Sequence, residues 1–169
     1  MDGGISLQFN EIETKIVLAQ FLVEGVIKAV GNIDNTLNDE RYNFVNVENP
    51  VTTPWPQHSP INAIRVAQST VKIHDMVLVY PTDPADQAEI PRMPGSQRGI
   101  VYAGEFVIYG DVLMGADMDL TNFIDGITKR FLTVADATIF PLFPAAMSIP
   151  EVMPLALVNR DMVYQIHAP

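Results

Sequence analysis

The chain has 169 residues, of which 48% are hydrophobic, and 10 Lys and Arg against 20 Asp and Glu give it a net charge of −10. This length fits one domain or two small ones, and the composition excludes the disordered class. The negative charge disfavours nucleic acids and anionic membranes as partners, and the absence of cysteine excludes disulfides, thiol nucleophiles and cysteine-based zinc sites.

The N-terminal run MDGGISLQFNEIETK lacks the basic start and the apolar stretch of a signal peptide. The longest apolar stretch, residues 16–30, is interrupted by Gln20, Glu24 and Lys28 and falls short of the roughly 20 residues that span a bilayer. We therefore expect a cytoplasmic protein that does not enter the membrane.

In chain order, the first predicted strands are residues 16–19, 20–27, 44–49 and 66–71. Alternation with a period of two places Phe21, Val23, Gly25 and Ile27 on one face of the second strand. Similar segments follow in the same order at 100–103, 105–112, 131–136 and 157–162, and the offset grows from 84 to 87 to 91. This pattern predicts an internal repeat, the alternative being two unrelated runs of β-like composition.

Clusters of proline divide the chain at the same places. Because proline cannot donate a hydrogen bond to a sheet, these clusters mark loops and a linker. They are Pro50, Pro54, Pro56 and Pro60 in the first copy, Pro141, Pro144, Pro150 and Pro154 in the second, and Pro81, Pro84, Pro91 and Pro94 between them. We predict a first β module at 1–80, a proline-rich linker at 81–98 and a second module at 99–169, with the backbones of about 12–76 and 99–167 superposing strand for strand.

Glycines are assigned structural roles. Gly104 is expected in a tight hairpin turn with positive φ, and the first copy is one residue shorter there, so its hairpin should turn differently. Gly25 and Gly110 should occupy equivalent strand positions where the sheet bends or another backbone approaches closely. The only predicted helix is 120–127, capped by Asp119, so helix content should be low.

The run IVYAGEFVIYGDVLMGADMDL resembles the first signature of Sm-like proteins: a strand, a tight glycine turn, a second strand with an inward glycine, here Gly110, and an acidic residue. LALVNRDMVYQI resembles the second signature, the final hairpin. The resemblance implies an all-β fold of two tandem, strongly bent antiparallel β-barrels of the Sm/SH3-like kind. Members that bind RNA carry an Arg-Gly pair in the final hairpin, where this chain has Asn159-Arg160, and 120–129 reads as an insertion.

Residues typical of catalysis or of metal binding form no known motif. His58, His74 and His167 have no zinc-ligand spacing, and the acidic loop around Asp117 lacks the glycine and glutamate of a calcium loop. No serine lies in a nucleophile motif, and no glycine-rich phosphate loop is present. We predict no catalytic residue, cofactor or metal.

The proline loops supply the candidate interaction surface, which comprises Trp55, His58, Phe140 and Phe143. Tryptophan is enriched at interaction hot spots, but a bulky aromatic also gains from burial, so a lid packed over the barrel is the favoured alternative.

The leading hypothesis for function is a non-catalytic assembly or protein-interaction module. Each copy is near the lower size limit for an independent core, so we expect self-association or binding to another protein. The resemblance implies six-unit rings, which three chains would form as a pseudo-hexamer. The alternatives are an RNA-binding Sm-like protein and a small-ligand binder or enzyme that uses the cleft between the copies.

Overall fold

The computed structural model describes residues 9–146 and 152–169, so Pro150 and the first eight residues lie outside the described part. Strands account for 56% of the structure and helices for 15%, and the sheet is mostly antiparallel. The prediction of an all-β fold with little helix is therefore confirmed. Within the described ranges, no helix is long and apolar enough to cross a membrane.

From residue 9 onward, the first half of the chain contains six strands, two short helices and one 3-10 turn. These are β1 (Phe9–Leu18), β2 (Phe21–Val30), α1 (Ile33–Asn38), β3 (Phe44–Pro54), β4 (Ile64–Arg65), β5 (Gln68–Lys72), η1 (Ile73–Asp75), β6 (Met76–Pro81) and α2 (Pro84–Ala88).

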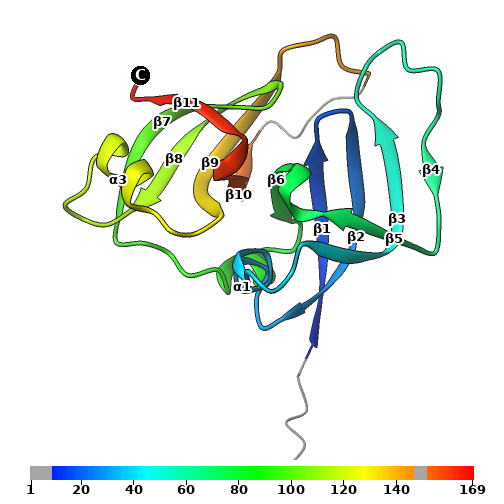
Figure 1. Cartoon of the computed structure of the whole chain (residues 1–169), viewed down its shortest axis with the longest axis horizontal. Helices are drawn as coiled ribbons and strands as arrows, with labels where there is room; N and C mark the ends of the chain where they lie inside the picture. Colours follow the sequence, from blue (N-terminus) through cyan, green and yellow to red (C-terminus); the bar gives the residue numbers. More distant parts are fainter. Residues whose placement is uncertain (1–8, 147–151) are drawn as a thin grey trace, which may run out of the picture.

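The second half follows almost the same succession. Its elements are β7 (Gly95–Ala103), β8 (Phe106–Met114), α3 (Leu120–Gly126), β9 (Phe131–Pro141), β10 (Met153–Asn159), η2 (Arg160–Met162) and β11 (Val163–His167). In Figure 1 the two halves lie side by side, with β6 and β10 between them.

All strands of the described residues belong to one sheet, in the order β11-β7-β8-β9-β10-β6-β1-β2-β3-β4, with β5 also paired to β3. The expected pair of closed barrels is not observed, because the described strands form a sheet that does not close into a barrel. Within this sheet each half repeats one order: β6-β1-β2-β3-β5 in the first half and β11-β7-β8-β9-β10 in the second.

The first hairpins of the two halves have the same loop length. Two residues separate β1 from β2, and two, Gly104 and Glu105, separate β7 from β8, so the expected one-residue difference is wrong. Gly104 has φ +56° in its turn, whereas neither loop residue of the first hairpin has a positive φ. Positions that correspond between the halves therefore differ by 85 here, as Gly25 and Gly110 do.

The predicted helix is present as α3, and the Asp119 side chain accepts a hydrogen bond from the Asn122 amide at 2.8 Å. The first half has a helix in the same place, α1, capped in the same way by Asn32. Residues 120–129 therefore have a counterpart in the first half, which also carries a short helix between its second and third strands. Asn32 and Asp119 differ by 87 positions, as do Phe44 and Phe131 at the starts of β3 and β9.

The later elements of the two halves correspond at a different offset from the expected one. The match of residues 66–71 to 157–162 is wrong, because Val71 lies in strand β5 whereas Met162 lies in the turn η2. The elements in the same place are β5 and β10, η1 and η2, and β6 and β11, again 87 positions apart. The segment 81–98 contains α2 and the start of β7, which begins at Gly95, four residues before the expected boundary.

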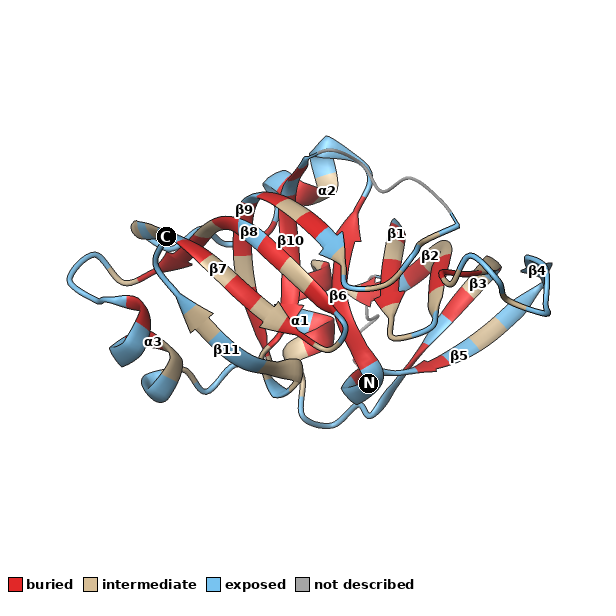
Figure 2. Ribbon diagram, turned by 90° about the horizontal axis from the view of Figure 1, so that it is seen from above, coloured by how far each residue is buried: buried red, intermediate tan, exposed pale blue. Residues whose placement is uncertain are grey.

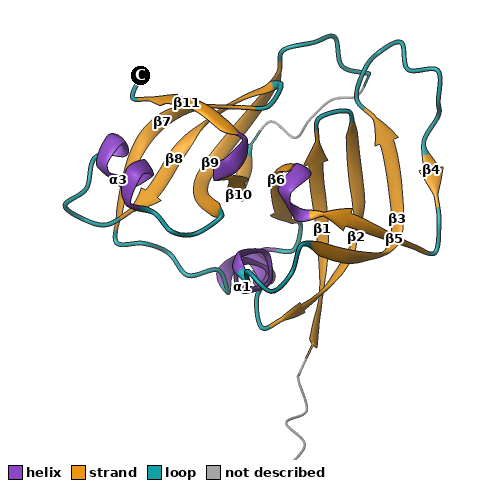
Figure 3. Cartoon of the chain, in the orientation of Figure 1, coloured by secondary structure: helices purple, strands orange, loops and turns teal. Residues whose placement is uncertain are grey.

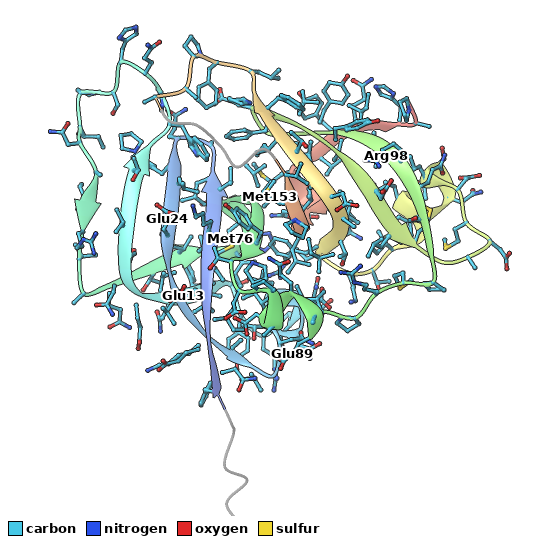
Figure 4. All side chains as sticks on the ribbon, turned by 180° about the vertical axis from the view of Figure 1, so that it is seen from behind. Glu13, Glu24, Met76, Glu89, Arg98 and Met153 are labelled. Carbon is cyan, nitrogen blue, oxygen red and sulfur yellow. The ribbon has the colours of Figure 1, made fainter. Side chains whose placement is uncertain are left out.

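The apolar core joins the two halves. Of its two clusters, one contains the interior of the second half together with Val77 and Tyr80 from β6. The other contains the interior of the first half together with Phe131 and Leu155 from β9 and β10. Figure 4 places the buried Met76 and Met153 near the middle of the molecule, where the halves meet.

Candidate functional site

The two halves are joined by backbone pairing between β6 and β10, which we call the inner junction. Leu157 pairs with Val79 and Val158 with Leu78, in antiparallel register. These four side chains are fully buried. In Figure 2 both strands are almost entirely red, as expected for central strands covered on both faces.

Asn159, at the end of β10, connects the inner junction to η1 of the other half. Its Nδ2 donates to the carbonyl oxygens of Ile73 (3.3 Å), His74 (3.3 Å) and Met76 (2.9 Å). Its Oδ1 accepts from the amide of Asp161 at 3.0 Å. Because Asn159 is fully buried, this amide satisfies polar groups that water does not reach.

Helix α1 makes a second polar connection and lies where the halves meet (Figure 3). The Asp34 carboxylate, whose side chain is only 3% exposed, accepts from Lys129 Nζ at 2.8 Å and from Asn38 Nδ2 at 2.8 Å. The Oδ1 of Asn38 in turn accepts from the amide of Phe131 at 2.9 Å. The short helix of one half thereby holds the first residues of β9 in the other.

Trp55, from the expected interaction surface, is buried between the halves. It is 1% exposed, and its ring contacts Phe106 of β8 edge-to-face with the centroids 5.7 Å apart. Its carbonyl accepts from the amide of Ala146 at 2.8 Å, and Pro56 and Ala145 form an antiparallel bridge, so the two proline loops pair here. The Trp55 side chain is therefore not exposed in this structure and packs against the interior of the opposite half.

The rest of that surface is divided. Phe143 is half-buried and packs on Phe106 at a centroid distance of 5.6 Å, next to Trp55. His58 is exposed, and Phe140 is 51% exposed. The structure therefore brings together Trp55 and Phe143, but as part of the core rather than as a shared exposed patch.

Three strands each pair with a single neighbour among the described residues: β11 with β7, β5 with β3, and the two-residue strand β4 also with β3. We call β5 and β11 the open edges. They correspond to β10 and β6, which are buried at the inner junction, yet Figure 2 shows both open edges largely in tan and blue. Such strands leave every second backbone amide and carbonyl without a ladder partner.

A cleft of about 300 Å³ lies between the halves, lined by Asn38, Glu40, His74, Thr128, Arg130, Arg160 and Asp161. His74 Nδ1 lies 3.5 Å from the Asp161 carboxylate. The guanidinium of Arg160 donates to the Ile127 carbonyl, and that of Arg130 donates to the Tyr42 carbonyl at 3.3 Å. Both arginines of this cleft thus help to hold its walls together.

The clearest pKa shifts lie outside this cleft. Hydrogen bonds from Arg41 lower the pKa of Asp39 to about 2. Burial raises the pKa of the Tyr80 phenol, and the hydrogen-bonded Glu24 raises that of Lys15. These shifts arise from a surface ion pair, a buried phenol and a cross-strand pair. Within the described ranges, no three His, Asp or Glu side chains are grouped so that they could hold a metal ion.

Sequence reasoning missed Asn159 and Asp34 as contacts between the halves. Asn159 drew attention only because it stands where an arginine was expected. The available signal was a lone amide at the end of the apolar run LALVN, since such a residue must find partners when buried. No signal in the sequence connects Asp34 with Lys129.

No family of known proteins matches the chain, and no curated protein or solved structure resembles it at a significant level.

Proposed function

We propose that the chain is a non-catalytic assembly module, built as a tandem duplication of a small Sm-like β module, and that its open edges bind further β strands. The observation that carries the proposal is the inner junction. There β6 of the first half pairs with β10 of the second half. The strands in the corresponding places, β11 and β5, remain at the edges of the sheet.

Three correspondences support the duplication. The strand order is the same in both halves, the capped helices α1 and α3 occupy the same place, and Gly25 and Gly110 have matching surroundings. A Cβ on either glycine would lie 2.6 Å from a valine Cγ1, of Val47 or of Val134. Two unrelated β segments have no reason to share so specific a contact, and the same features support the Sm-like resemblance.

The assembly we favour is a closed ring. A head-to-tail contact that repeats the inner junction would pair β11 of one chain with β5 of the next, and repeated identical contacts close when the rotation allows. Three chains would supply six modules and leave no open edge. Closure is also the most complete way for a protein to protect edge strands from aggregation.

Light scattering over a range of concentrations tests this function. We expect the mass to rise with concentration from the 18.7 kDa of one chain toward about 56 kDa, the mass of three. A mass that stays at 18.7 kDa up to millimolar concentration would refute assembly through the open edges.

Nucleic acid is not expected to bind. The net charge of −10 repels phosphate, and Asn159-Arg160 replaces the Arg-Gly pair of the RNA-binding relatives. A gel shift at about 150 mM salt, near physiological ionic strength, should show no complex with single-stranded RNA or duplex DNA. Sub-micromolar binding to either would contradict this prediction and favour the RNA-binding alternative.

A further inference from the structure

The inner junction provides a template for what the open edges would bind. Shifting its paired residues by 87 positions exchanges the halves: Leu157 becomes Thr70 on β5, and Val79 becomes Ile166 on β11. Thr70 is exposed and Ile166 is half-buried. The two edges therefore present strands of five residues each that can pair in the register of the inner junction.

The position of Asn159 corresponds to Lys72 at the end of β5. The three carbonyls that accept from Asn159 belong to η1 and the start of β6, and the corresponding positions in the second half are Arg160, Asp161 and Val163. An ammonium carries three donors, one for each of the three carbonyls in this group. In the single chain Lys72 is about half exposed and lies 3.7 Å from Asp75.

The position of Asn38 corresponds to Asp125 on α3, and that of its partner Phe131 corresponds to Phe44. Asp125 is exposed, and its carboxylate can accept a backbone amide as the Asn38 oxygen does. Phe44 is 53% exposed at the start of β3, whereas Phe131 is 1% exposed at the inner junction. Lys72 and Asp125 thus place charged groups where the inner junction uses the neutral amides of Asn159 and Asn38.

Apolar residues beside the inner junction are likewise replaced by charged or polar residues at the corresponding positions of the first half. Leu113, Ala135 and Leu155, which are buried beside the inner junction, have charged or polar counterparts on the first half. These are Lys28, Glu48 and Gln68, and Lys28 forms an ion pair with Glu48 at 2.7 Å. A junction between the open edges of two chains, which we call the outer junction, would therefore bury less apolar surface than the inner junction. Salt would screen its charged contacts.

We propose that the strand bound at the open edges is that of a second copy of this chain, joined head to tail through an ionic version of the inner junction. In it Thr70 of one chain pairs with Ile166 of the next, Lys72 donates to the carbonyls around η2, and Asp125 accepts from the amide of Phe44. This inference rests on the proposed assembly function and adds the partner, the register and the contacts. An ionic junction of this kind makes the association of chains reversible and sensitive to salt.

Cysteine cross-linking tests the register, because the natural chain contains no cysteine. The variant with Thr70→Cys and Ile166→Cys should form disulfide-linked multimers on mild oxidation. The matched control, Gln68→Cys with Ile166→Cys, moves one partner by two residues on the same face of β5, where the pairing with β3 is regular, and should remain monomeric on a denaturing gel. Equal linkage in both variants, or linkage in the control alone, would overturn the register.

Lys72→Glu tests the ionic contact. We expect it to weaken association measured by light scattering at least tenfold, with an unchanged melting temperature, while Lys72→Arg keeps association within about threefold of the natural chain. If multimers form but Lys72→Glu leaves them unchanged and the Thr70–Ile166 pair does not link, this inference fails and the assembly function stands. If every sample remains at 18.7 kDa, both fail.

Discussion

Gly110→Val should destabilise the protein by about 3 kcal/mol in the free energy of unfolding, because there is no room for a side chain at this position. A Cβ on Gly110 would lie 2.6 Å from Val134 Cγ1 and 2.8 Å from the Ala135 carbonyl oxygen. The second of these atoms belongs to the backbone of β9, so the sheet itself would have to move. Unfolding in urea, followed by circular dichroism, measures the loss.

The crowding at Gly110 follows from a bulge in the sheet. The register of β8 against β9 shifts between Tyr109 and Asp111, and opposite this shift Asp136 has φ +47°. Bulges of this kind bend a strand and bring neighbouring backbones close together. The first half has the same arrangement at Gly25, where Asn49 has φ +49°.

Gly126→Ala is the matched control. A Cβ there would find no atom closer than 3.9 Å, and the residue ends helix α3. We expect a change within about 0.5 kcal/mol, as for most substitutions away from buried features. Unfolding of Gly110→Val at the same urea concentration as the natural chain would contradict the role assigned to the bulge.

Asn159→Asp should be at least as damaging, at about 3–5 kcal/mol near neutral pH, because it places an unpaired carboxylate in the core. The substitution preserves shape but replaces the donating Nδ2 by an oxygen that would face the carbonyls of Ile73, His74 and Met76. All four groups would then be acceptors with no proton between them. The expected result is a large fall in the urea midpoint.

The effect of Asn159→Asp should depend on pH. Burial and the surrounding carbonyls disfavour the ionised form, so the pKa of the new carboxyl rises in the folded state above its unfolded value of about 3.9. The destabilisation is therefore smallest below about pH 4 and grows as the pH rises. Asn46→Asp, the same change on the exposed part of β3, is the control and should be nearly neutral. A small, pH-independent effect of Asn159→Asp would contradict the assigned contacts.

The parts of the fold that follow from short-range patterns could be predicted from the sequence. Alternation along β2 and β8 indicates half-buried strands, and Asp119 before Leu120 indicates the start of α3. The equivalent helix α1 escaped detection, although Asn32 gives it the same cap. It is a single turn and a half within polar sequence, and it is stabilised by contacts with the other half.

The register of the later strands could not be predicted, because β6 and β10 are covered on both faces. Their side chains are buried with little alternation, so they read as continuous apolar runs that align equally well at several offsets. The expected offset between matched positions of the two halves changed from 87 to 91 because the later segment began within such a run, at Leu157 in β10. The inner junction was missed for a related reason: Asn159 and Ile73 are 86 positions apart and meet only in space.

Hydrogen–deuterium exchange at several protein concentrations tests most directly whether the inner junction leaves β5 and β11 as edges that assemble. The account predicts that alternate amides of 68–72 and 163–167 exchange rapidly in dilute solution and become protected as the concentration rises. The amides of 76–81 and 153–159, in the corresponding strands of the inner junction, should be protected throughout. Edge amides that exchange at one rate at every concentration, or β10 amides as labile as those of β5, would contradict it.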